Sequence, residues 1–145
     1  MGNKDEFYTL KGYQINETGG LTTAMEDYLE MICRMAEENK GVRTGELSKK
    51  LHVKPPSATK MIQQLNRAGY IQAEKYGFVH LTEKGWEAGR YLLYRHEVIR
   101  RFLCTLNKSL DQLEQVEKIE HFLDRITVEN LDVLTKFLNN EIDHW

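Results

Sequence analysis

The chain has 145 residues, of which 41% are hydrophobic, and its formal net charge is −2. This length suits one domain or one small domain with an appendage, and the composition supports a packed core. No apolar run is long enough to cross a bilayer, and there is no signal-peptide pattern, so we expect a cytoplasmic protein. Cys33 and Cys104 form no CxxC pair, which argues against a disulfide framework or a thiolate zinc site.

The N-terminal part of the chain combines a polar arm with a first long helix. Residues 1–20 end in Gly19-Gly20, and we expect them to form a separate arm. Thr23-Ala-Met-Glu26 is a capping box that predicts a helix start. Apolar residues follow with helical spacing, and the helix is expected to end near Asn39-Lys40-Gly41.

Two shorter helices are predicted next. Thr44 is expected to cap a helix through Leu51. Pro55-Pro56 suits the first positions of the following helix, where a missing N–H has no cost. That helix is expected to stop at Ala68-Gly69.

A hairpin and a long helix come after this pair. The β-like stretches 70–71 and 78–81 flank a tight point at Gly77 and predict two strands. Thr82 is expected to start a helix that reaches about Leu106. Gly85 and Gly89 lie in its first turns, which suggests close packing there.

Two further helices are predicted near the C-terminus. Ser109-Leu-Asp-Gln112 is a second capping box, and apolar residues recur after it at helical spacing from Leu110 to Leu123. Thr127 is expected to cap the last helix, whose apolar stripe runs from Leu131 to Leu138.

The element order is that of a winged helix-turn-helix followed by helices. We therefore predict a mainly α fold with three segments: an arm (1–20), a winged helix-turn-helix DNA-binding domain of three helices and a two-stranded wing (21–82), and a helical domain (83–145). Charge agrees with this division. From Lys40 to Arg95 there are eleven Lys and Arg against four Asp and Glu, whereas the remaining residues hold nine basic and eighteen acidic side chains. A basic segment inside an acidic chain suits a polyanion, although it also suits a solvated face.

The second helix of the motif carries the candidate DNA-reading side chains. A helix of this length fits the major groove of B-DNA, where glutamine can pair with adenine and lysine or hydroxyls can bind phosphate. The candidates on this helix, beside it and in the wing are Lys54, Pro56, Ser57, Thr59, Lys60, Gln63, Gln64, Lys75 and Tyr76.

Acidic and imidazole side chains recur at helical spacing outside the basic segment. Asp27 and Glu30 are at i, i+3, and Glu117, Glu120 and His121 are at i, i+3, i+4, so each set shares a helix face. His96 lies on the apolar side of the long helix. Each part also has a structural interpretation: a satisfied core histidine, first-turn charges that favour the helix dipole, or a solvated face.

Gathering four carboxylates in a partly buried place requires cations, because repulsion and desolvation both oppose it. Two divalent ions would balance four carboxylates and two neutral imidazoles. Oxygen and imidazole donors without sulfur suit Mn²⁺ or Fe²⁺ better than a thiophilic ion.

Several motifs together resemble the DtxR family of metal-dependent transcriptional repressors, in its manganese-responsive branch. They cover roughly Thr22 to Leu138 and comprise the segments Met25–Glu30, Pro55–Met61, Glu74–Tyr76, Leu81–Gly85, Tyr94–Glu97 and Val116–His121.

The resemblance implies metal ligands at Asp27, Glu30, His96, Glu117, Glu120 and His121. Iron-responsive relatives carry Met and Cys at the positions of Asp27 and Glu117, so the manganese branch is favoured. The resemblance also implies a homodimer through the C-terminal helices, a binuclear Mn²⁺ site in each subunit, binding to a double-stranded DNA operator, and repression of metal-uptake genes. Gly77 lies near the position at which the manganese-responsive branch carries an arginine, which implies weaker contacts between the wing and DNA.

Three alternatives remain open at this stage. One is an Fe²⁺-responsive repressor of the same family, and another is a winged-helix regulator that senses an organic ligand. A ferritin-like di-metal enzyme is the third, but such bundles use Glu-x-x-His on two helices, whereas this chain has Glu-x-x-Glu-His once. We find no nucleophile–base arrangement and no phosphate-cradling glycine loop, so no enzymatic activity, organic substrate or membrane partner is expected.

Overall fold

The computed structural model describes residues 20–38 and 41–143, so the predicted arm lies outside the described residues except for Gly20. The chain forms two compact units: an N-terminal unit, Ala24–Tyr94, and a C-terminal unit made mainly of Arg95–Trp145. The predicted division after residue 82 rests on the sequence pattern and stays a prediction. None of the described helices is both long and apolar enough to span a bilayer.

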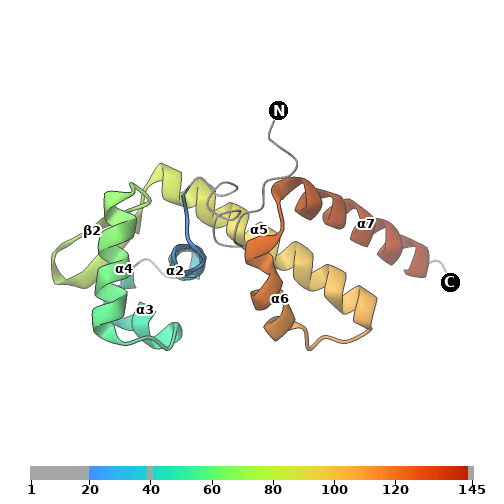
Figure 1. Cartoon of the computed structure of the whole chain (residues 1–145), viewed down its shortest axis with the longest axis horizontal. Helices are drawn as coiled ribbons and strands as arrows, with labels where there is room; N and C mark the ends of the chain where they lie inside the picture. The colour runs from blue at the N-terminus through green and yellow to red at the C-terminus, as the bar shows by residue number, and fades with distance from the viewer. Residues whose placement is uncertain (1–19, 39–40, 144–145) are drawn as a thin grey trace, which may run out of the picture. The chain divides into compact units, whose positions relative to one another are not determined.

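The N-terminal unit contains the winged helix-turn-helix (Figure 1). Helices α3 and α4 contact each other, and α4 also contacts the small sheet. Apolar residues from every layer are buried, among them Ile32 of α2, Leu47 of α3, Leu65 of α4 and Ile71 of β2. The elements in chain order are α2 (Thr23–Glu38), β1 (Val42–Arg43), α3 (Thr44–Lys50), α4 (Pro55–Arg67), β2 (Ile71–Ala73), η1 (Lys75–Gly77), β3 (Phe78–Leu81) and the first part of α5 (Glu83–Asn107).

The start and end of α4 confirm the local prediction. Lys54 is the N-cap residue, and the two prolines occupy the first helical positions. Gly69, just beyond the C-cap residue Ala68, has a φ of +86°, a conformation that glycine adopts at little cost.

The wing is part of a three-stranded antiparallel sheet with the order β1-β3-β2. The hairpin of β2 and β3 was predicted, but β1 was not. A two-residue strand has no periodicity of its own and exists here because Val42 pairs with Val79 and Arg43 pairs with Phe78.

The two glycines of α5 permit the close packing that was predicted. A Cβ atom on Gly85 would overlap the backbone carbonyl oxygen of Tyr70, and one on Gly89 would lie 2.8 Å from the Cβ of Cys33 in α2. In the N-terminal unit, α2 and the segment between α4 and β2 therefore approach the backbone of α5 directly.

The C-terminal unit consists of the second part of α5, α6 (Leu113–Ile119), η2 (Glu120–Phe122) and α7 (Arg125–Asp143). Its core contains Ile99, Leu103 and Val116, with Phe102, Ile119 and Leu123 packed against it. Polar contacts join α7 to α5, since the Thr105 hydroxyl donates to the Asn139 Oδ1 at 3.1 Å and Arg101 approaches Asp132 at 3.9 Å.

Two predicted helix starts in this unit were wrong. The Ser109 hydroxyl accepts from the Asp111 N–H, but α6 begins only at Leu113, and Leu110 is exposed. The α7 helix begins at Arg125 because the Asp124 carboxylate, rather than Thr127, caps it: the Thr127 N–H donates to Asp124 Oδ1 at 2.8 Å. A carboxylate is an equally good cap and stands three residues earlier.

Candidate functional site

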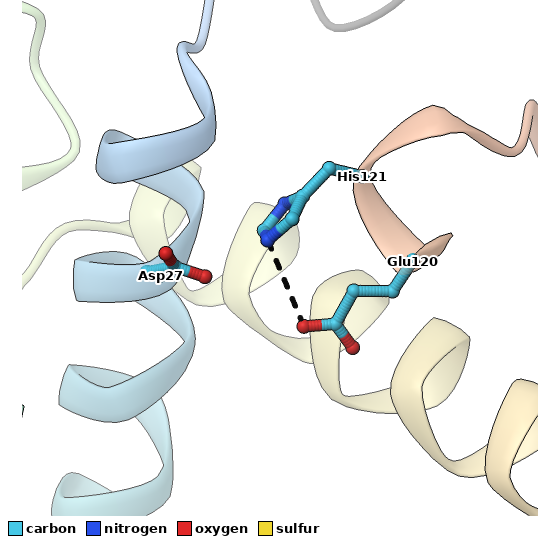
Figure 2. A group of neighbouring side chains, drawn as sticks. All are labelled: Asp27, Glu120 and His121. Carbon is cyan, nitrogen blue, oxygen red and sulfur yellow. Dashed lines mark ion pairs between the residues drawn. The ribbon is translucent and has the colours of Figure 1, made fainter. Parts of the chain in front are cut away.

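Three of the predicted metal ligands meet within the C-terminal unit. The His96 Nδ1 on α5 lies 2.7 Å from Glu120 Oε2. The other oxygen, Glu120 Oε1, lies 3.8 Å from His121 Nε2, the ion pair drawn as a dashed line in Figure 2. The Glu120 side chain is 2% exposed and that of His121 is 5% exposed. A carboxylate is therefore buried between two imidazoles.

The end of α6 explains how Glu120 and His121 reach this position. The α-helix stops at Ile119, and the chain tightens into a 3-10 turn over Glu120–Phe122. Both side chains are buried, whereas Glu117, one turn earlier, is exposed. Glu117 was predicted to share a face with them, but the change of helix type separates their environments.

Arg95 is a residue that the sequence analysis missed. Its side chain is buried, and its Nη2 lies 3.5 Å from His121 Nδ1. A guanidinium only donates hydrogen bonds, so this contact favours the ring orientation in which Nδ1 accepts and Nε2 faces Glu120. The available signal was its position directly before His96 in the motif Tyr94–Glu97.

Asp27 and Glu30 lie on α2, in the N-terminal unit. Asp27 is half-buried, and the Glu30 side chain is 12% exposed, with its Oε1 3.5 Å from Arg34 Nη2. The spacing of three residues places the two carboxylates on one helix face. Asp27 is also drawn in Figure 2 as a side chain of this helix.

The donor set fits a divalent cation of the Mn²⁺ or Fe²⁺ type. Carboxylate oxygens and imidazole nitrogens bind such ions, and a buried carboxylate is stabilised by positive charge. The thiol of Cys33 on α2 is a poor donor, because burial raises its pKa to about 11 and keeps it protonated at neutral pH.

The candidate DNA-reading residues lie on the outer face of α4 and at the wing tip. The opposite face of α4 is buried through Ala58, Ile62 and Leu65. Gln64 is half-buried, whereas the other candidates are exposed: Lys54, Pro56, Ser57, Thr59, Lys60, Gln63, Lys75 and Tyr76. This arrangement leaves one polar, basic helix face free to enter a groove.

The C-terminal unit exposes a set of large apolar side chains that the sequence analysis had assigned mainly to helix stripes. They lie at the end of α5, on and around α6 and η2, and on α7, and comprise Leu106, Leu110, Leu113, Phe122, Ile126, Val133, Leu134 and Phe137. We call them the C-terminal apolar face. Large apolar side chains that are exposed in this number are typical of a unit that contacts another protein.

Comparison with known proteins gives two matching family domains. Residues 20–79 match "Iron dependent repressor, N-terminal DNA binding domain", and residues 82–143 match "Iron dependent repressor, metal binding and dimerisation domain". The chain is 37% identical over 117 residues to the HTH-type transcriptional regulator MntR of Bacillus pumilus, covering 80% of this chain and 81% of that protein. It is 35% identical over 121 residues to MntR of Bacillus subtilis, covering 83% and 85%.

Solved structures agree in fold. The manganese regulator SloR has a TM-score of 0.67 at 31% identity, over 79% of this chain and 53% of that one. The metal-dependent transcriptional regulator MtsR has a TM-score of 0.70 at 27% identity, over 78% and 54%. The chain thus spans about half the length of these solved relatives.

Proposed function

This chain belongs to the iron-dependent repressor family of metal-dependent, DNA-binding transcriptional regulators, which is not an enzyme family, and from that premise we propose that it is a Mn²⁺-activated repressor. The observation that carries the proposal is the buried Glu120 carboxylate between the imidazoles of His96 and His121.

The proposed ligands are the six residues that the sequence singled out: Asp27, Glu30, His96, Glu117, Glu120 and His121. Two Mn²⁺ ions for each subunit would balance their four carboxylates. The bound metal would supply the positive charge that lets these carboxylates gather. Support comes from the donor chemistry of His96, Glu120 and His121 and from the metal-binding domain match over residues 82–143.

The choice of Mn²⁺ over Fe²⁺ rests on donor hardness. Asp27 and Glu117 offer oxygen where iron-responsive relatives offer sulfur, and oxygen donors suit Mn²⁺. The description of the solved relative SloR as a manganese regulator points the same way. Fe²⁺ activation is the second candidate, because imidazole and carboxylate ligands also suit that ion.

Activation is proposed to work as a population shift between conformations. Asp27 and Glu30 belong to the N-terminal unit, and His96, Glu120 and His121 belong to the C-terminal unit. Ligands shared by two units would restrict their relative motion only in the metal-bound form. The metal must bind the DNA-competent arrangement more tightly, since equal affinity for both arrangements shifts nothing.

The DNA partner is proposed to be a duplex operator with two half-sites. The outer face of α4 would enter the major groove, with Lys60 and the hydroxyls near phosphates and Gln63 at a base edge. The C-terminal apolar face would form the interface between two subunits, which presents two recognition helices. The dimerisation domain match over residues 82–143 supports this assignment.

The test measures DNA affinity with and without metal. A duplex is first selected from a random pool by the wild-type protein in MnCl₂, and its affinity is then measured at fixed salt. We expect Mn²⁺ to raise the affinity by about 5- to 150-fold, the range typical of allosteric coupling. Parallel titrations with Fe²⁺ under anaerobic conditions compare the two ions.

Matched variants locate the response. Glu120→Gln removes a proposed ligand without changing side-chain size and should abolish the effect of Mn²⁺. Glu114→Gln changes an exposed residue of α6 that pairs with Lys118 at 2.9 Å, and it should retain the full response. Equal wild-type affinity with and without either metal would exclude the metal switch.

A further inference from the structure

The wing contacts β1 and the first residue of α3. Arg43 pairs with Phe78 in the sheet, and its guanidinium lies over the Phe78 ring at 4.4 Å from the centroid. The neighbouring Thr44 hydroxyl donates to the Gly77 carbonyl oxygen at 3.2 Å. Thr44 was expected to cap α3, but the N-cap residue is Arg43, whose side chain makes no capping hydrogen bond, and the Thr44 hydroxyl contacts the wing instead.

The tip itself is a tight turn that presents its side chains outward. Tyr76 has φ 67° and ψ 20°, and Gly77 has φ +82°. A non-glycine residue in this left-handed region costs roughly 1–2 kcal/mol, so the surrounding contacts must hold it. The Glu74 N–H donates to the Phe78 carbonyl oxygen at 2.8 Å, and the Thr44 contact adds a second restraint. Tyr76 is thereby kept 91% exposed.

Arg43 combines exposure with a fixed orientation. The residue is exposed, and within residues 20–38 and 41–143 the structure gives its guanidinium no carboxylate partner. Stacking on a ring occupies one face of the guanidinium plane and leaves the N–H groups on its edge available. Planar N–H groups on a pre-positioned arginine match the geometry of a phosphate group.

The charge of the surroundings favours an anionic ligand. Arg43 lies within the basic segment from Lys40 to Arg95, and across the sheet it adjoins the wing that carries exposed Lys75. We propose that Arg43 binds a DNA backbone phosphate beside the wing, with the Phe78 ring orienting its guanidinium. This inference rests on the proposed DNA-binding function and adds a residue that the sequence analysis did not include.

The experiment counts phosphate contacts by salt dependence. The affinity of the full-length protein for the selected duplex is measured in saturating MnCl₂ over a range of KCl concentrations. Each phosphate contact contributes about 0.9 to the slope of log K against log salt. We expect Arg43→Gln to reduce the slope by about 0.9 for each subunit and to weaken binding to unrelated duplexes equally. Arg43→Lys should restore the slope because it keeps the charge.

Two variants separate this role from others. Arg90→Gln removes another exposed arginine of the same unit, which stacks on Trp86 at 4.9 Å, and it should leave the slope unchanged. Thr44→Val removes the hydrogen bond to Gly77 while keeping Arg43, so it should also preserve the slope. An unchanged slope in Arg43→Gln, or an equal loss in Thr44→Val or Arg90→Gln, would overturn the proposal. Failure of the wild type to bind any duplex would instead refute the proposed function.

Discussion

The two units of the chain differ in what they leave exposed. The N-terminal unit buries most of its large apolar side chains from α2 to β3, and its most exposed large hydrophobic residue is Tyr76 at the wing tip. The C-terminal unit has a small core around Ile99, Leu103 and Val116 and exposes large apolar side chains on its helices. The outer face of α4 and the wing tip are polar and basic, whereas the C-terminal unit exposes apolar side chains among charged ones.

This difference indicates that the units meet different partners. A polar surface with lysine and glutamine suits DNA, whose phosphates and base edges form hydrogen bonds. An apolar surface gains free energy when it is removed from water and suits a second copy of the chain. Polar contacts between α5 and α7, such as that of Thr105 with Asn139, show that α7 packs against α5 partly through polar side chains.

The largest expected effect comes from placing a charge on the C-terminal apolar face, which tests whether this face binds a second copy of the chain. Phe137 on α7 is 59% exposed, and Phe137→Asp should dissociate the dimer. Burying one phenylalanine contributes about 2 kcal/mol, and a two-fold symmetric interface contains the substituted residue twice. The dimer dissociation constant should therefore rise roughly a thousandfold. Analytical ultracentrifugation measures this, and Asn140→Asp, an exposed site on the same helix, is the control. A dimer that persists in Phe137→Asp would show that this face is not the interface.

The second prediction sharpens the comparison by testing the internal packing of the N-terminal unit. Gly85→Ala would place a methyl group against the Tyr70 carbonyl oxygen and should lower the free energy of unfolding by about 1–3 kcal/mol. Dimerisation should not change. Urea unfolding followed by circular dichroism measures the effect. Gly45→Ala on α3, where a Cβ meets nothing within 4 Å, should be neutral or stabilising; equal stability of both variants would contradict the packing argument.

The smallest expected effect concerns the cap of α7. Hydrogen bonds from Thr127 lower the pKa of Asp124 from its usual 3.8. A lowered folded-state pKa means that the carboxylate contributes stability above about pH 4, and this contribution is lost as the pH falls through the folded pKa. The thermal midpoint of Asp124→Ala should therefore lie below that of the wild type at pH 7, with the gap narrowing at pH 3. A gap that does not depend on pH would indicate that the charge has no role.

Sequence signals correctly predicted the helix ends that are determined by the residue at that position. The prolines before Ser57 and the glycine after Ala68 mark the ends of α4, since each restricts or frees the backbone at its own position. The capping boxes were less reliable. Ser109 forms its local hydrogen bond without starting a helix, and Asp124 takes the capping role assigned to Thr127. Several residues compete to cap a helix, and packing decides between them.

For the candidate site, residue type and spacing identified His96, Glu120 and His121 as a group, and the structure brings these three together. Spacing did not reveal that Glu117 is exposed, because the 3-10 turn after Ile119 changes the helical phase. It also did not reveal Arg95, whose contact with His121 joins residues 26 positions apart.

The sequence by itself determined the winged helix-turn-helix order, the polar face of α4 and the chemistry of the metal donors, because periodicity and side-chain type act over a few residues. Tertiary structure alone decided which carboxylate is buried, which hydroxyl contacts the wing, and that Val42 and Arg43 form a strand. These outcomes depend on contacts between distant segments, whose free energies outweigh local preference.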